Sequence, residues 1–473
     1  MYKPQRVHPM AILQFTLRTV YSLGQGLIPL LLIAFAQPEM RRWLFWGLPL
    51  LLAFMVAYGI LYWLCYVFYI SGQELRVEYG VLIKKKRYIP FERIQTIQIS
   101  AGILHRMFGL VKVQVETAGG GSQAEFVLAA LPRDIAAELQ HILQEKTQHH
   151  EEPGNETEYI EYKLSTRSLL VLASTSNGIG IVLSAILAVI SQLDDFFPKA
   201  DVWGKFAAYA GHLAAGKISL IILVVFLIIL LAWLLSLLGT IMQFGGFQLR
   251  REGNNIIISR GLFEKHQMSI PIKRIQAIKV VEGLLRQPLG MVSLQVVSMS
   301  TTGMKEEGNV LFPILPKAEL PGFVEKIAPE FTMSMKLHGL PARSKWGYLL
   351  INTIPALIIA ILCTVYLPWG YVAFILPLLG AALGNAQYND AGYQVENNRL
   401  LLRSRHLGRV TFIIPKQRVQ SMHVSQNPLQ ARGNLSNLRI AVASSNAAAT
   451  VQLRGMDIQK SSVIMKWLFA QRH

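Results

Sequence analysis

The chain has 473 residues, of which 52% are hydrophobic and only 16% are charged. This composition excludes an ordinary soluble enzyme and a disordered chain, and two cysteines exclude a disulfide framework or a cysteine-rich metal site. Lysine and arginine (46) outnumber aspartate and glutamate (28), so the formal net charge is +18, and the location of this charge decides which partner it indicates.

Six apolar stretches predict membrane helices, because a spanning helix needs ~20 mostly apolar residues. They form three closely spaced pairs, each followed by a long polar segment, at residues 20–36, 43–63, 169–190, 218–242, 348–367 and 370–385. The first stretch also resembles a secretory signal, since it follows Lys3 and Arg6 and ends in Ala34-Phe35-Ala36. We favour an uncleaved hairpin, because the other two pairs repeat the same arrangement.

The distribution of basic residues predicts the orientation of the chain. Three hairpins return the chain each time to the side on which it started, so the polar segments share one side with both termini. Only five of the 46 basic residues fall at the hairpin tips. By the positive-inside rule the polar segments are cytoplasmic, in the cell membrane, and topology rather than nucleic acid explains the excess charge.

The three polar segments repeat one another around an Ile-Pro-x-x-Arg-Ile/Val-Gln motif. A basic residue recurs six positions before the Pro, and a Leu recurs 14 positions after it (Leu104, Leu285 and Leu429). Alternating apolar residues predict several short strands, and each copy ends in a helical pattern, at residues 317–327 in the second copy and 456–469 in the third. Each module is therefore expected to be a curved antiparallel sheet closed by a helix. The motif residues are Pro90, Arg93 and Gln95, then Pro271, Arg274 and Gln276, then Pro415, Arg418 and Gln420.

These patterns divide the chain into alternating hairpins and modules. The expected hairpins are residues 1–66, 169–243 and 337–387, and the expected modules are residues 67–148, 244–336 and 388–473, with an acidic linker at 149–168. The predicted fold class is therefore three membrane α-helical hairpins (six spans) with three β-rich modules.

The repeat resembles the bacterial pleckstrin-homology-like (PH-like) family of YdbS/YdbT type. The pattern is a Gly before a strand, the Ile-Pro-x-x-Arg-Ile-Gln motif, and a later Leu and Gly. The first two copies hold the leading Gly as Gly80 and Gly261, whereas the third has Arg405 there and Val419 in place of the motif Ile. The resemblance implies a PH-like barrel in each module and a smaller, single-module PH-like membrane protein as a partner. It supplies no established activity.

The run Lys84-Lys85-Lys86-Arg87 is the main candidate lipid-binding segment, with Lys265 and Arg409 at the matching place in the other copies. Anionic headgroups attract basic residues by ~1 kcal/mol each near a membrane surface. Alternation along a strand lets only about half of the run face one ligand. A solvated strand end that merely supports orientation explains the run equally well. For the recurring motif arginines, we favour a structural role over phosphate contact.

One carboxamide recurs beside a helix breaker in the first helix of each hairpin, as Gln25, Asn177 and Asn352. A carboxamide in lipid needs a partner, so we expect these side chains to join helices. The alternative is a polar path for transport, which the absence of charged residues deep in any span disfavours.

No catalytic spacing is present. The sequence lacks a phosphate-binding Gly-x-x-x-x-Gly-Lys-Ser/Thr loop, a His-Glu-x-x-His pair and a Gly-x-Ser-x-Gly elbow, so we expect no enzyme, cofactor or metal site. The favoured function is a membrane scaffold that engages anionic lipid or partner proteins, in envelope integrity or in resistance to membrane-active agents. A component of a lipid or peptide transporter is the alternative.

Overall fold

The computed structural model describes residues 4–17, 19–23, 38–117, 126–139, 160–176, 178, 180–185, 188, 218–298, 309–332, 334, 336–367, 370–444 and 449–470. It forms two compact units. Unit 1 holds Met1–Thr157, Glu264–Pro271 and Met299–Gly303, and unit 2 holds Glu158–Phe263, Ile272–Ser298 and Met304–His473.

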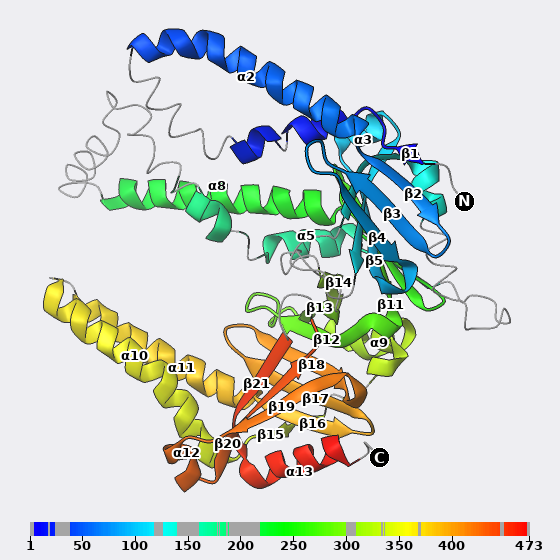
Figure 1. Ribbon diagram of the computed structural model, residues 1–473. Helices are drawn as coiled ribbons and strands as arrows, with labels where there is room; N and C mark the ends of the chain where they lie inside the picture. Colours follow the sequence, from blue (N-terminus) through cyan, green and yellow to red (C-terminus); the bar gives the residue numbers. More distant parts are fainter. Residues whose placement is uncertain are drawn as a thin grey trace. The chain divides into compact units, whose positions relative to one another are not determined.

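Four helices in the described part of the chain are long and apolar enough to cross a membrane (Figure 1). They match the second, fourth, fifth and sixth expected spans. The other two expected spans are not among these helices: residues 24–36 of the first and six positions of the third lie outside the described residues, so the number six stays a prediction. The helices are α2 (Pro38–Leu64), α8 (Ile218–Phe244), α10 (Lys345–Tyr366) and, after a short 3-10 turn at Gly370–Phe374, α11 (Ile375–Asp390).

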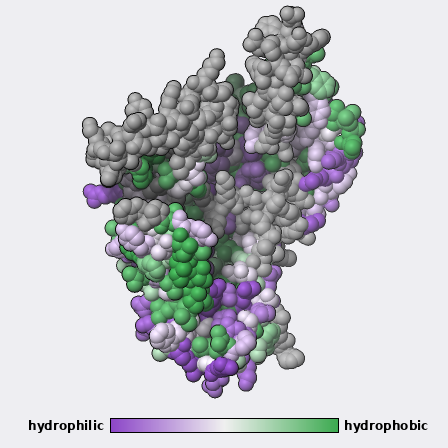
Figure 2. Space-filling view, turned by 90° about the vertical axis from the view of Figure 1, so that its left-hand side faces the viewer, coloured by the Kyte–Doolittle hydropathy of each residue, from purple (hydrophilic) through white to green (hydrophobic). Residues whose placement is uncertain are grey.

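The apolar side chains of these helices are largely exposed to the surroundings, as helices in lipid require. Leu50, Phe226 and Leu378 are 73%, 58% and 71% exposed. Figure 2, which looks toward the left-hand side of Figure 1, shows a continuous hydrophobic area on the described surface with hydrophilic residues beside it.

Within the described residues, seven strands recur in each module in the same order. In unit 1 they are β1 (Gln5–Arg6), β2 (Val67–Ser71), β3 (Glu74–Tyr79) and β4 (Lys85–Pro90), which form one sheet, and β5 (Ile94–Ala101), β6 (Leu110–Thr117) and β7 (Phe126–Pro132), which belong to a second. In the third module they are β15 (His338–Gly339), β16 (Gly392–Glu396), β17 (Arg399–Arg405) and β18 (Arg409–Pro415), then β19 (Val419–Ser425), β20 (Leu435–Val442) and β21 (Ala449–Asp457). The second module has β8 (Ile160–Lys163), β9 (Gln248–Glu252), β10 (Asn255–Arg260), β11 (Lys265–Pro271), β12 (Ile275–Glu282), β13 (Met291–Ser298) and β14 (Val310–Pro316).

The first strand of each module precedes the helices. Strand β1 pairs with β2, β8 with β9 and β15 with β16, so the chain leaves the sheet after one strand, forms the helical segment, and returns to pair beside it. These first strands lie outside the module ranges expected from sequence. Their shortness hides them, because two to four residues carry no visible alternation. Both ends of each helical segment are therefore fixed in one sheet.

Closure of the expected PH-like barrels is not confirmed, because the sheets remain open in the described residues. Strand β5 pairs antiparallel with β11 in unit 1, and β12 pairs antiparallel with β18 in unit 2. Strands β5 and β12 thus each use their outer edge to pair with the strand that ends in the Pro of the next module. That edge is therefore not used to close a barrel.

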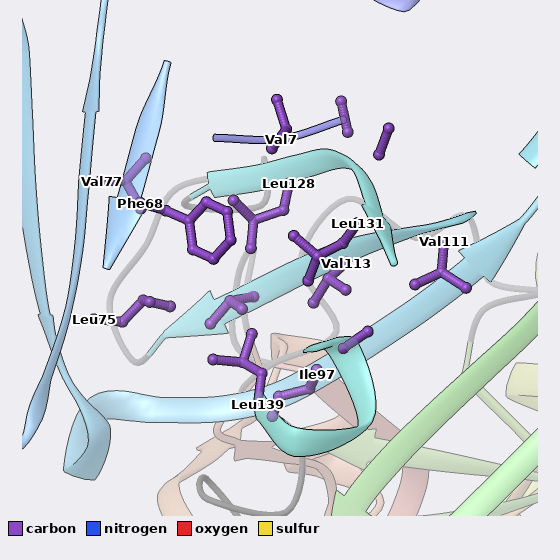
Figure 3. Packing of buried hydrophobic residues seen from close by; sticks show 14 of the residues in the cluster. Val7, Phe68, Leu75, Val77, Ile97, Val111, Val113, Leu128, Leu131 and Leu139 are labelled. Atoms are coloured by element: carbon purple, nitrogen blue, oxygen red, sulfur yellow. The ribbon is translucent and has the colours of Figure 1, made fainter. Parts of the chain in front are cut away.

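The core of the first module lies between its two sheets (Figure 3). Phe68, Leu75 and Val77 from the first sheet face Val113 and Leu128 from the second, and each is at most 4% exposed. The helices expected at 317–327 and 456–469 are confirmed as a 3-10 turn at Lys317–Glu319 followed by α9 (Leu320–Ile327), and as α13 (Ile458–Phe469).

Candidate functional site

The Ile-Pro-x-x-Arg motif forms the corner between the two sheets of a module. The Pro is the last residue of its strand, a three-residue 3-10 turn follows, and the next strand begins at the motif Ile or Val. In all three copies the residue after the Pro donates its N–H to a carbonyl in the tight turn between the second and third strands of the module. These bonds are Phe91 to Gln73 (3.0 Å), Ile272 to Asn254 (2.8 Å) and Lys416 to Asn398 (2.7 Å).

This geometry favours the structural role expected for the motif. Pro90, Pro271 and Pro415 have no N–H to donate, and a strand end before a sharp turn tolerates that loss. In the second copy the side-chain amide of Gln276, only 6% exposed, donates to the carbonyl of Arg274 at 3.0 Å. The side chain of Gln95 lies outside the described residues.

In every module, the loop between the third and fourth strands (β3–β4, β10–β11 and β17–β18) lies at the end of a membrane helix. In the first, the rings of Tyr66, just after α2, and Tyr79, just before the loop, are 6.1 Å apart. In the second, the N–H of Leu262 donates to the carbonyl of Met242 in α8 at 3.0 Å. In the third, Gln387 of α11 donates to the carbonyl of His406 at 3.0 Å.

These loops expose large apolar side chains. Leu82 and Ile83 are 93% and 73% exposed, Leu262 and Phe263 are 47% and 51% exposed, and Leu407 is 61% exposed. A soluble protein rarely gathers such side chains at the tip of a hairpin without a use for them. Their place at the helix ends indicates the region where a bilayer meets water.

A second loop in each module has the same character. The recurring Leu104, Leu285 and Leu429 are 49%, 58% and 77% exposed, so they are not core residues. In the first copy Leu104 lies on α3 (Ile103–Met107), and in the third Leu429 lies on α12 (Pro428–Arg432). We call residues 80–84, 261–263 and 406–408 the helix-end loops, and residues 102–109, 283–289 and 426–432 the second exposed loops.

The second exposed loop of the second module also contacts the end of a short helix that overlaps the third expected span. The guanidinium of Arg286 donates through Nε to the hydroxyl of Thr175 at 3.1 Å, and Thr175 directly follows α5 (Thr166–Ser174). Burial lowers the pKa of Arg286 from its ordinary value. This contact places residues 283–289 beside the start of the expected second hairpin.

In the first module the basic run follows directly after the apolar tip. Lys84, Lys85, Lys86 and Arg87 are all exposed. The register sets Lys86 opposite Glu78 and Arg87 opposite the buried Val77, so alternate members face opposite sides as the sequence indicated. Lys86 binds Glu78 at 3.1 Å, and this hydrogen bond raises the pKa of Lys86.

In the second module the matching residue, Lys265, is exposed at the start of β11. It lies between Glu264 and His266, which contact each other at 3.6 Å. The hydrogen bond from His266 lowers the pKa of Glu264, so this carboxylate stays ionised beside Lys265. The local positive charge is therefore smaller than at the run of the first module.

In the third module the matching residue, Arg409, belongs to a cluster of ion pairs. It contacts Glu282 of β12 at 3.0 Å and Asp390, the last residue of α11, at 2.5 Å. The side chain of Glu282 is 5% exposed and also binds Lys317 at 3.1 Å. Burial alone lowers the pKa of Arg409, but the bond to Asp390 and both carboxylate charges outweigh it and raise the pKa.

The departure of the third copy from the repeat has a structural reason. Gly80 and Gly261 begin their loops at φ values of 108° and 102°, which side chains rarely adopt. In the third module, strands β17 and β18 instead remain paired up to this position, so that Arg405 lies opposite Arg409. Arg405 then reaches Asp390 at 2.5 Å and the amide oxygen of Gln287 at 2.6 Å.

We call Glu282, Lys317, Asp390, Arg405 and Arg409 the acid–arginine cluster. Sequence reasoning missed its acids. Two signals could have indicated these acids. Glu282 stands at the repeat position where the first module has Ala101, and Asp390 follows the sixth expected span.

Of the three recurring carboxamides, only Asn352 lies within the described residues. Its amide donates to the side-chain oxygen of Gln387 at 2.8 Å and to the carbonyl of Tyr348 at 2.9 Å. The first bond joins α10 to α11, which lie side by side in Figure 1. Asn352 thus packs the hairpin together, whereas Gln25 and Asn177 lie outside the described residues.

Comparisons with known proteins agree with this organisation. The family model for the bacterial PH domain matches residues 21–147, 206–330 and 349–472. The chain is also 33% identical, over 488 aligned positions covering 99% of it and 98% of the relative, to the UPF0699 transmembrane protein YdbT of Bacillus subtilis (strain 168). The resemblance read from the repeated motif is thus confirmed, and the chain is a transmembrane protein that belongs to the bacterial PH domain family.

Proposed function

We propose that this protein is a non-enzymatic membrane scaffold, and that residues 82–87 of its first module bind anionic lipid at the cytoplasmic surface. In this proposal the hairpins fix the modules beside the bilayer, and the remaining surfaces of the modules hold partner proteins. Envelope integrity and resistance to membrane-active agents are the processes that such a scaffold would serve.

One observation carries the lipid proposal. The most exposed apolar pair of the helix-end loops, Leu82 and Ile83, directly precedes four exposed cations. An apolar tip can enter the headgroup region while neighbouring lysines stay at the charged surface. Each Lys or Arg near an anionic surface contributes ~1 kcal/mol, so this combination favours acidic over zwitterionic lipid.

The other two modules support attachment but give less lipid selectivity. Their loops expose Leu262, Phe263 and Leu407, yet Lys265 lies beside Glu264, and Arg409 binds Glu282 and Asp390. We therefore restrict the anionic-lipid site to residues 82–87 and leave Arg409 out of it.

A cytoplasmic location of the modules follows from the positive-inside rule, and it is part of the proposal. Transport receives no separate support, because the side-chain amide of Asn352 donates to Gln387 of α11 and to the carbonyl of Tyr348 in its own helix, which accounts for it by helix packing.

The test is a change of environment at the tip of the loop. The full chain, with Cys65 and Cys363 replaced by Ala, carries an environment-sensitive fluorophore on Leu82→Cys and is reconstituted into nanodiscs. We expect a blue-shifted emission, protected from an aqueous quencher, in discs with phosphatidylglycerol, and less protection in phosphatidylcholine alone. Reversal of Lys84, Lys85, Lys86 and Arg87 to Glu should abolish the difference between the two lipids.

The matched control reverses Lys460 and Lys466, which are exposed on α13 of the third module and belong to none of the helix-end loops. This change should leave the difference between the lipids intact. Equal protection of the fluorophore in both lipids, or no effect of reversing residues 84–87, would overturn the proposed lipid site.

A further inference from the structure

Two strand pairings inside this chain join one module to the next in the same way. In unit 1, β11 pairs antiparallel with β5, and Lys265 lies opposite Ala101. In unit 2, β18 pairs antiparallel with β12, and Arg409 lies opposite Glu282. In each case the residue six before one Pro (271 or 415) lies opposite the residue eleven after the previous Pro (90 or 271).

The register is identical along both pairings. Ser269, two before its Pro, lies opposite Ile97, seven after the previous Pro, and Ile413 lies opposite Ile278 in the same relation. Two independent occurrences of one register indicate a general mode of binding between PH-like modules. The strand before the Pro corner is the donor, and the strand after the corner is the acceptor.

In the third module, the acceptor strand β19 has no donor strand paired with it in the described residues. Strand β19 is the end strand of the sheet β19-β20-β21, and no strand in the described part of the chain pairs with its second edge. In β12, which pairs with β18, Gln276, Ala277 and Glu282 are buried. The matching residues of the third module, Gln420, Ser421 and Gln426, are exposed.

This edge also lacks the devices that prevent strands from pairing. Edge strands are commonly protected by lysine, proline or inward-pointing charge. Residues 419–425 contain no Lys, Arg, Asp, Glu or Pro. Met422 and Val424 also keep the apolar alternation of the two paired acceptor strands, β5 and β12. An exposed strand edge of this kind is a template for a strand from another chain.

We propose that β19 binds the donor strand of a PH-like module on a separate protein, in the register found twice within this chain. The proposal deepens the scaffold function and rests on it, because it names the partner class and the surface that holds it. Main-chain hydrogen bonds supply the affinity, and alternate side chains supply the specificity.

A second copy of this chain fits the edge poorly. Its donor strand would be β4, where Lys85, Lys86 and Arg87 stand in place of the Val410, Thr411 and Phe412 of β18. In the shared register Arg87 would lie opposite His423, which itself lies opposite Arg439 of β20. Like charges facing each other across strands are destabilising, and lysines on an edge prevent pairing.

The test uses photo-crosslinking in the native membrane of the cell that makes the protein. The full chain carries benzoylphenylalanine at Ser425 or at His423, and crosslinked peptides are identified by mass spectrometry. In the shared register Ser425 lies opposite the residue five before the partner's Pro, and His423 lies opposite the residue three before it. We expect the two probes to react two residues apart in a strand that precedes an Ile-Pro-x-x-Arg motif.

The control probe is at Thr450, an exposed residue of β21 at the other side of the same sheet, and it should not give this product. The double variant His423→Lys and Ser425→Lys should abolish crosslinking from a probe at Ser421 while the chain keeps its thermal stability. Reversal of residues 84–87 should leave crosslinking unchanged, which separates this proposal from the lipid site.

Three outcomes would overturn the proposal. Crosslinks to residues 85–87 of another copy would show self-assembly instead. A product with a protein that lacks the Pro corner would show a different partner class. The absence of a protein product from both probes would show that the edge stays open in the membrane.

Discussion

Lys84 and Arg409 occupy the same position of the repeat, yet they have different surroundings. Lys84 is exposed beside Leu82 and Ile83, with a solvated face. Arg409 has a side chain only 21% exposed and binds two carboxylates. The comparison shows that the repeat preserves a backbone position, whereas the neighbouring acids decide whether a cation there stabilises the fold or remains available to a ligand.

The largest expected effect is at the acid of the buried cluster. Glu282→Gln removes a carboxylate that binds both Arg409 and Lys317, and it leaves these charges with less compensation. Breaking such a buried pair costs about 3 kcal/mol. The measurement is the thermal unfolding midpoint of the purified full chain in detergent.

The matched control is Glu78→Gln, which removes the half-buried partner of the exposed Lys86 in the first module. An exposed pair contributes about 0.2–1 kcal/mol, so the midpoint should hardly move. If the two variants lose equal stability, the distinction between the buried cluster and the exposed run is wrong.

The second effect concerns the hairpin that supplies Asp390 to the cluster. Gly384 of α11 lies so close to α10 that a Cβ there would be 2.5 Å from the carbonyl oxygen of Tyr348. Gly384→Leu should therefore separate the helices and cost about 1–3 kcal/mol, measured by the same unfolding midpoint. Gly347→Leu is the control, since no heavy atom lies within 4 Å of the added Cβ, and equal losses would contradict close packing at Gly384.

A smaller effect is expected at the carboxamide pair of the same hairpin. Asn352→Leu removes the 2.8 Å bond to Gln387, and hydrogen bonds between membrane helices contribute about 0.6 kcal/mol on average. A double-mutant cycle with Gln387→Leu measures the coupling between the two side chains. Additive losses would show that the pair does not contribute to packing α10 against α11.

The sequence predicted the elements that carry a long periodic signal. The repeat, four of the spans and the helices at 317–327 and 456–469 follow from hydrophobic length, spacing and internal similarity. The first strands β1, β8 and β15 were missed because they are short and separated from their modules by the helices.

The sequence did not predict how the sheets of neighbouring modules join, because the residue pattern of one module carries no information about its neighbours. The pairing of β5 with β11 and of β12 with β18 depends on strands far apart in sequence. The candidate site was found only in part for the same reason. The run at Lys84–Arg87 is visible as composition, whereas the ion pairs of Arg409 require Glu282 and Asp390, which lie 127 and 19 positions away.

The smallest expected effect on stability is at Lys84, the exposed member of the compared pair. Lys84→Gln removes an exposed charge, so the free energy of unfolding should change by no more than about 0.5 kcal/mol. Arg409→Gln should lower the unfolding midpoint clearly, because Glu282 and Asp390 then lose a shared cation. In the nanodisc assay the order should reverse, with Lys84→Gln reducing protection of the Leu82 probe and Arg409→Gln leaving it unchanged. A loss of both stability and lipid response at Lys84 would mean that the first module, like the third, uses this position to hold its fold.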